Sequence, residues 1–305
     1  MPSPRSPFVL VGEALVDIVV PVHGEPENAP GGSPLNVAVG LSRLGLDAVL
    51  VTELGDDEHG RLVLDHVTGS GVDLHEGSVV LGHRTSTATA HLDEHHAATY
   101  EFDLTWSLGP RTLPAGAIGL HVGSIGSALR PGRDAVVDLL DQAVAAGVLV
   151  SYDPNARPVF LPPAPQAWED MNEVAAHADL VKMSDEDVHA FAPDSTPTEV
   201  AEHLLANGRT RLVVVTHGGG GAEAFTRHGS VRVPSEPVRV VDTVGAGDSF
   251  MGALIAVTLE WGLDLEVDRA EALLRAAHAV AGITCSRRGA NPPTRQELPP
   301  AWPAG

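Results

Sequence analysis

The chain has 305 residues, of which 43% are hydrophobic, and its 19 basic and 40 acidic residues give a formal net charge of −21. This length allows one large or two ordinary domains with a sizeable core. Because binding to nucleic acid or to an anionic membrane needs clustered positive charge, the acidic excess excludes both kinds of partner. Lys182 is the only lysine, so any lysine-dependent chemistry must use it.

The apolar run at residues 8–22 is interrupted by Glu13 and Asp17. It is too short and too charged to span a bilayer, and it lacks the pattern of a secretory signal peptide. Cys285 is the only cysteine, so an intrachain disulfide cannot form. Together these features predict a protein of the reducing cytoplasm, without a membrane partner.

Short apolar runs alternate with helical patterns along most of the chain. Continuous runs of this kind are typical of strands that are buried on both faces of a parallel sheet. Strands are predicted at residues 8–12, 48–54, 119–124, 148–155, 179–184 and 211–217. Helices that each end at a glycine are predicted at 35–45, 132–147 and 198–208. The alternation predicts an α/β fold with a doubly wound, mostly parallel sheet flanked by helices.

Two segments depart from this alternation. Residues from about 17 to 30 and from about 84 to 105 show two-residue alternation and turn residues, with no helix between the strands. They predict a small antiparallel β lid, inserted in a single domain that spans residues 1–305. The proline-rich residues 292–305 predict a surface extension.

Two nucleotide motifs and one metal motif can be excluded. The chain contains neither the G-x-x-x-x-G-K-[ST] loop of P-loop NTPases nor the G-x-G-x-x-G fingerprint of dinucleotide-binding proteins. Residues 91–95, HLDEH, match the order of ligands in some zinc peptidases. That chemistry needs both histidines on one helical face, whereas these follow an alternating strand. We therefore expect a hairpin tip there.

Three glycine-rich corners remain, each at a predicted strand-to-helix transition. In PGGSPLN at 30–36, Gly31 and Gly32 allow the backbone to approach a ligand closely, although an ordinary tight turn would also explain them. The THGGGG segment at 216–221 follows a buried strand. Four consecutive glycines are unfavourable in conformational entropy unless the backbone wraps a ligand, which favours a binding loop.

The third corner, DTVGAGD at 242–248, places Gly245, Ala246 and Gly247 directly before Asp248 at the start of an apolar helix. The aspartate could simply cap the helix. The amides, however, form an anion site, where a carboxylate would repel a resting phosphate. A hydroxyl that accepts a phosphoryl group needs both a base and amides that stabilise the transferring group. The combination therefore predicts phosphoryl transfer.

At this point the sequence resembles a known family. DTVGAGDSF resembles the C-terminal signature of the ribokinase-like, or phosphofructokinase-B type, carbohydrate kinases, and GGSPLNVAVGLSRLG resembles their N-terminal signature. GEALVD, DPNARP and VKMSDED are closest to the bacterial fructokinase branch. The resemblance covers nearly the whole chain. It implies an enzyme that transfers the γ-phosphoryl group of ATP to a sugar, with Mg²⁺ and K⁺ as its ions.

The resemblance also implies roles for single residues. Asp248 would be the base, and the anion hole would consist of the amides of Gly245, Ala246 and Gly247. The sugar would contact Asp17, Gly32 and Asn36, with Arg157 on the substrate or phosphate side. The nucleotide would be lined by Thr216, Gly218 and Gly221, and its magnesium-bound phosphates by Ser184 and Asp187. A potassium ion would bind the backbone carbonyls of Asp242 and Val244.

Two departures from the family pattern bear on these roles. The N-x-x-E motif of ribokinases reads SDED at residues 184–187, and the shorter acid Asp187 is expected to reach Mg²⁺ through water. The predicted lid has Asp103 where many relatives have arginine, and Arg84 is its only arginine. Because a sugar acid needs a cationic partner, we expect a neutral sugar, and fructose first.

Several alternatives stay open at the level of sequence. The same family includes 2-keto-3-deoxygluconate kinases, ribokinases and nucleoside kinases, although an aromatic content of 4% disfavours a nucleoside, which would need rings to stack on. A different class would be a catalytically silent sugar-binding protein on the same scaffold, because fold does not fix function. The resemblance further implies a homodimer that pairs through the lid.

Overall fold

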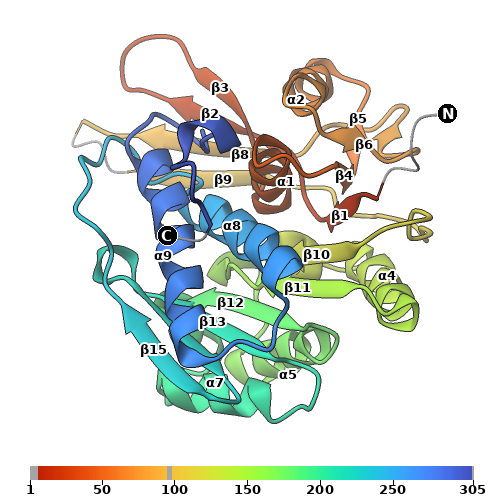
Figure 1. Cartoon of the computed structure of the whole chain (residues 1–305). Coiled ribbons are helices and arrows are strands. Elements are labelled where there is room, and N and C mark those ends of the chain that lie inside the picture. Colours follow the sequence, from red (N-terminus) through yellow and green to blue (C-terminus); the bar gives the residue numbers. More distant parts are fainter. Residues whose placement is uncertain (1–5, 95–97, 304–305) are drawn as a thin grey trace, which may run out of the picture.

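A computed structural model of the chain describes residues 6–94 and 98–303. Its main sheet consists of β1 (Phe8–Val11), β4 (Ala48–Val51), β6 (Asp73–Leu74), β10 (Gly119–Gly123), β11 (Leu149–Asp153), β12 (Leu180–Ser184), β13 (Leu212–Thr216), β14 (Ala222–Thr226) and β15 (Gly229–Val233). The nine strands follow the order β15-β14-β13-β12-β11-β10-β1-β4-β6 (Figure 1). All pairs from β13 to β6 are parallel, and β14 and β15 are antiparallel.

Helices cover both faces of this sheet. One face carries α1 (Ser33–Arg43), α2 (Glu58–Gly69), α8 (Ala246–Trp261) and α9 (Val267–Cys285). The other carries α4 (Gly132–Ala146), α5 (Ala164–Ala175), α6 (Asp185–Phe191) and α7 (Pro197–Leu205), with the short α3 (Ser124–Ala128) packed on α4. This arrangement confirms the predicted doubly wound, mostly parallel fold. A two-stranded ribbon of β5 (Leu54–Gly55) and β7 (Val79–Val80) lies apart from the main sheet.

The continuous apolar runs are explained by the two covered faces. In β1, Phe8 and Leu10 pack into the core under α1 and α8, whereas Val9 and Val11 pack into the core under α4 and α5. Successive side chains of a strand point to opposite faces, so a strand between two helical layers needs apolar residues at every position. The continuous apolar runs in the sequence therefore indicated that this sheet is buried on both faces.

The predicted lid is a second, smaller sheet of β2 (Leu15–Val20), β3 (Glu27–Gly31), β8 (Thr87–Leu92) and β9 (Ala98–Asp103), in the order β3-β2-β8-β9. Its two hairpins, β2/β3 and β8/β9, are antiparallel, as predicted, and they join through the parallel pair β2/β8. The HLDEH motif ends β8 and enters the following hairpin tip, whose His95 lies outside the described residues.

The proline-rich tail differs from its prediction. Pro292, Pro293 and Leu298 are buried, and the Trp302 indole nitrogen donates a hydrogen bond to the Ala276 carbonyl in α9 at 3.0 Å. A tail with a tryptophan and several prolines has apolar surface to bury, and it does so against α9. The segment up to residue 303 is thus packed on the domain rather than extended from it.

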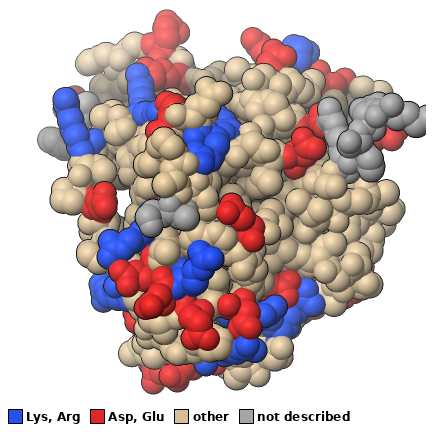
Figure 2. Space-filling view, viewed as in Figure 1, with Lys and Arg blue, Asp and Glu red and all other residues tan. Residues whose placement is uncertain are grey.

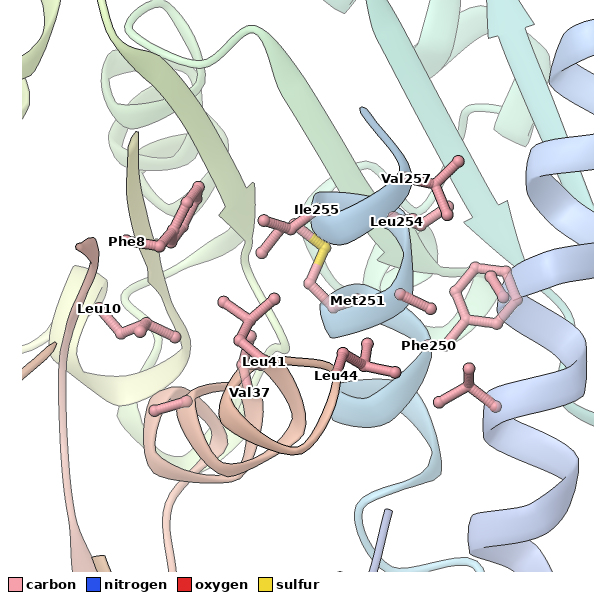
Figure 3. Close-up of a cluster of buried hydrophobic side chains, with 14 of the residues drawn as sticks. Phe8, Leu10, Val37, Leu41, Leu44, Phe250, Met251, Leu254, Ile255 and Val257 are labelled. Atoms are coloured by element: carbon pink, nitrogen blue, oxygen red, sulfur yellow. The ribbon is translucent and has the colours of Figure 1, made fainter. Parts of the chain in front are cut away.

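Helices α1 and α8 share the core that positions the site. Val37 and Leu41 of α1 face Met251 and Ile255 of α8, and all four are completely buried (Figure 3). Gly252 brings the two backbones close, because a Cβ atom on it would lie 3.8 Å from the Val37 carbonyl oxygen. This packing holds the N-terminal ends of both helices together at one edge of the sheet.

The described part of the chain has no membrane-spanning helix, and the face in Figure 2 shows no continuous patch of basic side chains. No helix in the described part of the chain is long and apolar enough to cross a membrane. On the face shown in Figure 2, basic side chains lie among acidic ones.

Candidate active site

Helix α8 begins at a turn that favours glycine. Gly245 has φ 73°, and a Cβ atom on it would lie 2.5 Å from the Cβ of Ala290. The first N–H groups of a helix have no acceptor within the helix, so this end presents donors and the positive end of the dipole. The Ala246 amide already donates to the Thr243 carbonyl at 3.2 Å. Of the three amides predicted to form the anion hole, that of Ala246 therefore already has an acceptor within the chain.

Asp248 lies on the first turn of α8, and α1 holds its carboxylate from two sides. Ser33 Oγ donates to Oδ1 at 2.6 Å, and Asn36 Nδ2 donates to Oδ2 at 2.8 Å. Asp248 is 8% exposed. Each oxygen keeps a further lone pair, so the carboxylate can still accept a proton while its orientation is fixed. The structure thus brings Asp248 and Asn36 together, and it adds Ser33, which the sequence did not indicate.

Gly31 and Gly32 make room for other parts of the chain, namely the Asp17 side chain and the Glu13 backbone. A Cβ atom on Gly31 would lie 2.1 Å from Oδ2 of Asp17, so this carboxylate packs directly on the β3 backbone. Gly32 has φ 112°, and a Cβ atom on it would lie 2.4 Å from the Glu13 carbonyl oxygen. Both were expected to admit a ligand. In the structure they bring two acidic residues to the edge of the lid.

These two acidic residues have raised pKa values. Burial raises the pKa of Asp17 to about 6, with Arg157 opposing the shift and Asp248 adding to it. Burial likewise raises the pKa of Glu13 to about 7, against a hydrogen bond from the Gly126 amide at 2.9 Å. Among the described residues, Asp17 has charge interactions but no hydrogen-bond donor that shifts its pKa. Its oxygens are therefore available to the hydroxyl groups of a ligand.

Arg157 lies on the loop that follows β11. Its side chain is exposed and folds back so that Nη1 donates to Oδ1 of Asn155 at 2.7 Å. The guanidinium lowers the pKa of both Asp17 and Glu13, so its charge acts on the sugar side of the site. A small cleft opens beside Arg157, but it is lined from α3, α5 and the loop after β11. Asp248 does not line this cleft.

The predicted nucleotide residues lie at the carboxyl edge of neighbouring strands. Ser184 and Thr216 end β12 and β13 and are paired in register. The glycine run then folds into a short 3₁₀ turn, with φ 50° at Gly218 and φ 96° at Gly221. A Cβ atom on Gly221 would lie 2.1 Å from the Val233 carbonyl oxygen. Ligands of open α/β sheets bind at this edge, which suits the predicted nucleotide role.

Asp187 caps helix α6. Its Oδ2 accepts from the Ser184 amide and its Oδ1 from the Ala156 amide, both at 2.7 Å. The Ser184 hydroxyl accepts from the Asp187 amide at 3.0 Å, which completes a capping box. The carboxylate thus ties the loop after β11 to the start of α6. The S-x-x-D spacing is a known sign of such a cap and could have revealed this role.

The loop before α8 is tied to the end of α9. Asp242 accepts from the Val244 amide at 3.0 Å and from the Gly289 amide at 2.8 Å. The amides of Val241 and Asp242 donate to the Cys285 carbonyl at 2.8 and 3.2 Å. Burial opposes ionisation of Asp242, but its amide donors hold its pKa below the usual value. Within the described residues no His, Cys, Asp and Glu side chains gather as a metal-binding cluster.

The only lysine is buried beneath the start of α8. Lys182 Nζ donates to Oδ2 of Asp153 at 2.6 Å, and the two side chains are 6% and 1% exposed. Its ammonium would lie 3.4 Å from a Cβ atom on Gly247. Burial alone would lower its pKa, but Asp153, Asp187 and Asp248 together raise it above the usual value. The side chain is therefore a permanent cation next to the anion site.

Comparison with known proteins places this site in a family. A model of the pfkB family carbohydrate kinases matches residues 8–297. The chain belongs to the pfkB family. A fructokinase of Klebsiella pneumoniae is 31% identical to it over 92% of this chain and 94% of that protein. Membership of the pfkB family confirms the resemblance found in the sequence, and with it a carbohydrate kinase.

Solved structures of the pfkB type agree with this assignment. Xylella fastidiosa fructokinase with bound ATP is 25% identical, with a TM-score of 0.81 over 97% of this chain and 96% of that one. A double mutant of Vibrio cholerae fructokinase in fructose, ADP and potassium ion bound form is 27% identical, with a TM-score of 0.79 over 94% of each chain. The roles of single residues in this pfkB protein stay predictions.

Proposed function

We propose that this protein is an ATP-dependent fructokinase, which converts D-fructose to fructose 6-phosphate. The proposal is carried by one observation: a carboxylate, Asp248, is held by Ser33 and Asn36 beside an anion-binding helix terminus. A base next to an anion site is what phosphoryl transfer to a hydroxyl requires. The fructokinase relatives, and the neighbours solved with ATP or with fructose and ADP, support the choice of substrates.

The reaction follows from the places of these groups. The 6-hydroxyl oxygen of fructose attacks the γ-phosphorus of ATP, and its proton passes to the Asp248 carboxylate. The new bond joins that oxygen to phosphorus, while the bond from phosphorus to the β,γ-bridging oxygen breaks and releases ADP. The amides at the start of α8 stabilise the negative charge on the transferring group. Ser33 and Asn36 keep the base oriented throughout.

The charge of the lid favours a neutral sugar. Arg84, the only arginine of the predicted lid, forms an exposed ion pair with Asp103 at 3.5 Å, so a carboxylate already competes for its charge. The half-buried Asp17 suits sugar hydroxyl groups, which can donate to a carboxylate, and it would repel a sugar acid. With Gly32, Asn36 and Arg157 it forms the proposed sugar wall. These features favour fructose over 2-keto-3-deoxygluconate.

We assign the nucleotide to the edge formed by Thr216, Gly218, Gly221 and Ser184. Magnesium on the ATP phosphates would offset their charge when bound. Both Asp187 oxygens already accept backbone amides, so this carboxylate fits a contact to magnesium through water, which the ion's retained hydration shell allows. The cap would thus persist when the nucleotide binds.

A potassium ion fits the loop before α8. The carbonyls of Asp242 and Val244 are the proposed ligands, and the loop is anchored to Gly289 and Cys285. A cation there would hold the anion hole in shape and add to its positive field. Potassium should therefore raise turnover above that in sodium or Tris at matched ionic strength. Equal rates in all three salts would remove the cation site.

We place the enzyme in the cytoplasm, as a homodimer that pairs through its lids. The free thiol of Cys285 suits a reducing compartment. On the lid, Val19 is 38% and Tyr100 63% exposed, so both present apolar surface that a second copy could cover. Light scattering coupled to gel filtration tests the dimer, and a mass of one chain at micromolar concentration would contradict it.

The substrate is tested by ADP release over a panel of fructose, 2-keto-3-deoxygluconate, ribose and adenosine. Fructose should give the highest kcat/KM, and the Asp248→Asn variant serves as the inactive control. A higher kcat/KM for 2-keto-3-deoxygluconate would overturn the choice of fructose. No turnover with any sugar, together with a fructose-dependent rise in Tm, would instead indicate a catalytically silent binding protein.

A further inference from the structure

The proposed mechanism leaves one buried charge without a role. We propose that Lys182, held in place by Asp153, supplies positive charge to the anion hole and stabilises the phosphoryl group during transfer. It would act from behind the Gly247 backbone and is therefore a positioning residue rather than a group that binds substrate. This inference rests on the proposed kinase function and adds a component to it.

The position of Lys182 is fixed by the sheet. Lys182 and Leu180 are two residues apart on β12, so they point to the same face. Leu180 belongs to the core beneath α1 and α8, which places the lysine under α8 as well. The ammonium lies so close to Gly247 that a Cβ atom there would be 3.4 Å away.

The bond to Asp153 holds the ammonium there. Asp153 is 1% exposed, and within the described residues its Oδ1 has no hydrogen-bond partner. The hydrogen bond from Lys182 Nζ to Oδ2, at 2.6 Å, is therefore the main interaction of this carboxylate. An ammonium has three N–H donors, and the bond to Asp153 uses one of them.

Stability does not explain why a charge pair is kept here. Replacing a buried ion pair by apolar residues of similar volume is often neutral or stabilising, so such a pair is weak support for a structural role. Function offers a reason. The carboxylates of Asp153, Asp187 and Asp248 all interact electrostatically with Lys182, and they would repel an incoming phosphate. One fixed cation offsets that repulsion.

The first test removes the cation. Lys182→Met should lower kcat by roughly 10²–10³, the loss found when one donor of an oxyanion hole is deleted. The KM for fructose should change by less than about threefold, because the ammonium acts on the transferring group. Arg133→Met is the matched control, since Arg133 is also a buried cation, 1% exposed, but belongs to α4 on the other face. It should lower Tm and leave kcat nearly unchanged.

A second variant separates catalysis from folding. Lys182→Met alone leaves the Asp153 carboxylate buried and unpaired, which destabilises proteins strongly. The double variant Asp153→Asn with Lys182→Met removes both charges and should regain most of the lost Tm. Its kcat should nevertheless stay roughly 10²–10³ below wild type. If the double variant recovers both Tm and kcat, the pair is structural and the proposal is wrong.

Binding of a transition-state mimic gives a readout that does not depend on turnover. With magnesium and fructose present, the Kd of ADP alone should be unchanged in the double variant. The Kd of ADP with aluminium fluoride should rise by the same factor by which kcat falls, because such mimics report transition-state binding. A variant that binds the fluoroaluminate complex as tightly as wild type would refute the role of Lys182.

The two proposals can fail separately. If the wild type phosphorylates another sugar better than fructose, the substrate assignment fails, and the Lys182 comparison is made with that sugar. If fructose is the substrate and the double variant turns it over at the wild-type rate, the role of Lys182 fails while the proposed function stands.

Discussion

The carboxylates of Asp248 and Asp17 are held in contrasting ways. Asp248 belongs to a helix whose core is completely buried, and it accepts one hydrogen bond from each of two side chains of α1. Asp17 belongs to the lid, packs on the backbone at Gly31, and has only charge interactions among the described residues. One carboxylate is preorganised before a ligand arrives, and the other still lacks donors.

This contrast suggests a division of labour. A base must be oriented before the reaction, because reorganisation in the transition state would slow the chemical step. A group that recognises a sugar gains most when its hydrogen bonds form only on binding. Changes near Asp248 should therefore lower kcat, and changes near Asp17 should raise KM. Four variants and one change of pH test this division.

The largest effect is expected from Asp248→Asn. Asparagine keeps the shape and the capping capacity but cannot take up the hydroxyl proton. If Asp248 is the base, kcat should fall by roughly 10²–10⁴. If it is only a cap, the change should be a few tenths of a kcal/mol in stability, with turnover intact. The measurements are kcat with fructose and Mg-ATP, and thermal melting. A variant that melts normally and keeps kcat within about threefold would refute the mechanism.

Gly31→Ala should give the next largest effect, and in KM. The new methyl group would lie 2.1 Å from the Asp17 carboxylate, which must move away. Loss of a hydrogen bond to a charged group corresponds to about 1.5–3 kcal/mol, so the KM for fructose should rise by roughly 10–100-fold. The matched control is Gly40→Ala, because a Cβ atom on Gly40 meets nothing within 4 Å. A main effect on kcat would break the proposed division.

The pH dependence of KM tests Asp17 without changing its neighbours. With a pKa of about 6, Asp17 takes up a proton as the pH falls below that value. The protonated group accepts sugar hydroxyls poorly, so KM should rise by up to about tenfold one pH unit below the pKa. The contribution of Asp17 to folding stability should instead be more favourable at low pH, where its binding of the sugar is weaker. The stabilisation from a raised carboxyl pKa is present at low pH and is lost as the pH rises through about 6.

Asp17→Asn isolates this residue, because Glu13 and Asp153 also titrate near neutral pH. The variant should have a high KM that no longer changes with pH, and the difference in Tm between the two proteins should depend on pH. An unchanged pH profile of KM in the variant would show that another group is responsible.

The smallest effect is expected from Ser33→Ala. It removes one of the two hydrogen bonds to the base, but Asn36 still orients the carboxylate, so only part of the roughly 1.5–3 kcal/mol of such a bond should reach the barrier and kcat should fall by roughly 2–10-fold with KM unchanged. In an Asp248→Asn background the same change should have little further effect, because the two residues act as a unit. Additive losses in the double variant would show that Ser33 acts elsewhere.

The fold was largely predictable from the sequence, for a physical reason. Strands between two helical layers must be apolar at every position, and the helix that ends at Gly147 carries a clear stop signal. The tail was not predictable, because nothing local shows that Trp302 has a partner at Ala276. Contacts between distant parts of a chain leave no periodic mark in one sequence.

The candidate site was predictable where chemistry gathers in one segment. The order of Gly247 and Asp248 indicated a base beside an anion site, while the cap formed by Asp187 was readable but not recognised. Ser33 was beyond reach, since its partner lies 215 residues away in the chain. Lys182 was singled out by its rarity, and only the sheet places it beneath α8.

The rarity of that lysine has a practical consequence. Because the chain contains one lysine, protein labelled with ¹⁵N at the lysine side-chain nitrogen would give a single side-chain resonance. That resonance comes from an ammonium beside Gly247, next to the proposed phosphoryl site. Binding of ADP, ATP or sugar could then be followed at this one atom without introducing a probe. The native chain thus contains its own spectroscopic reporter.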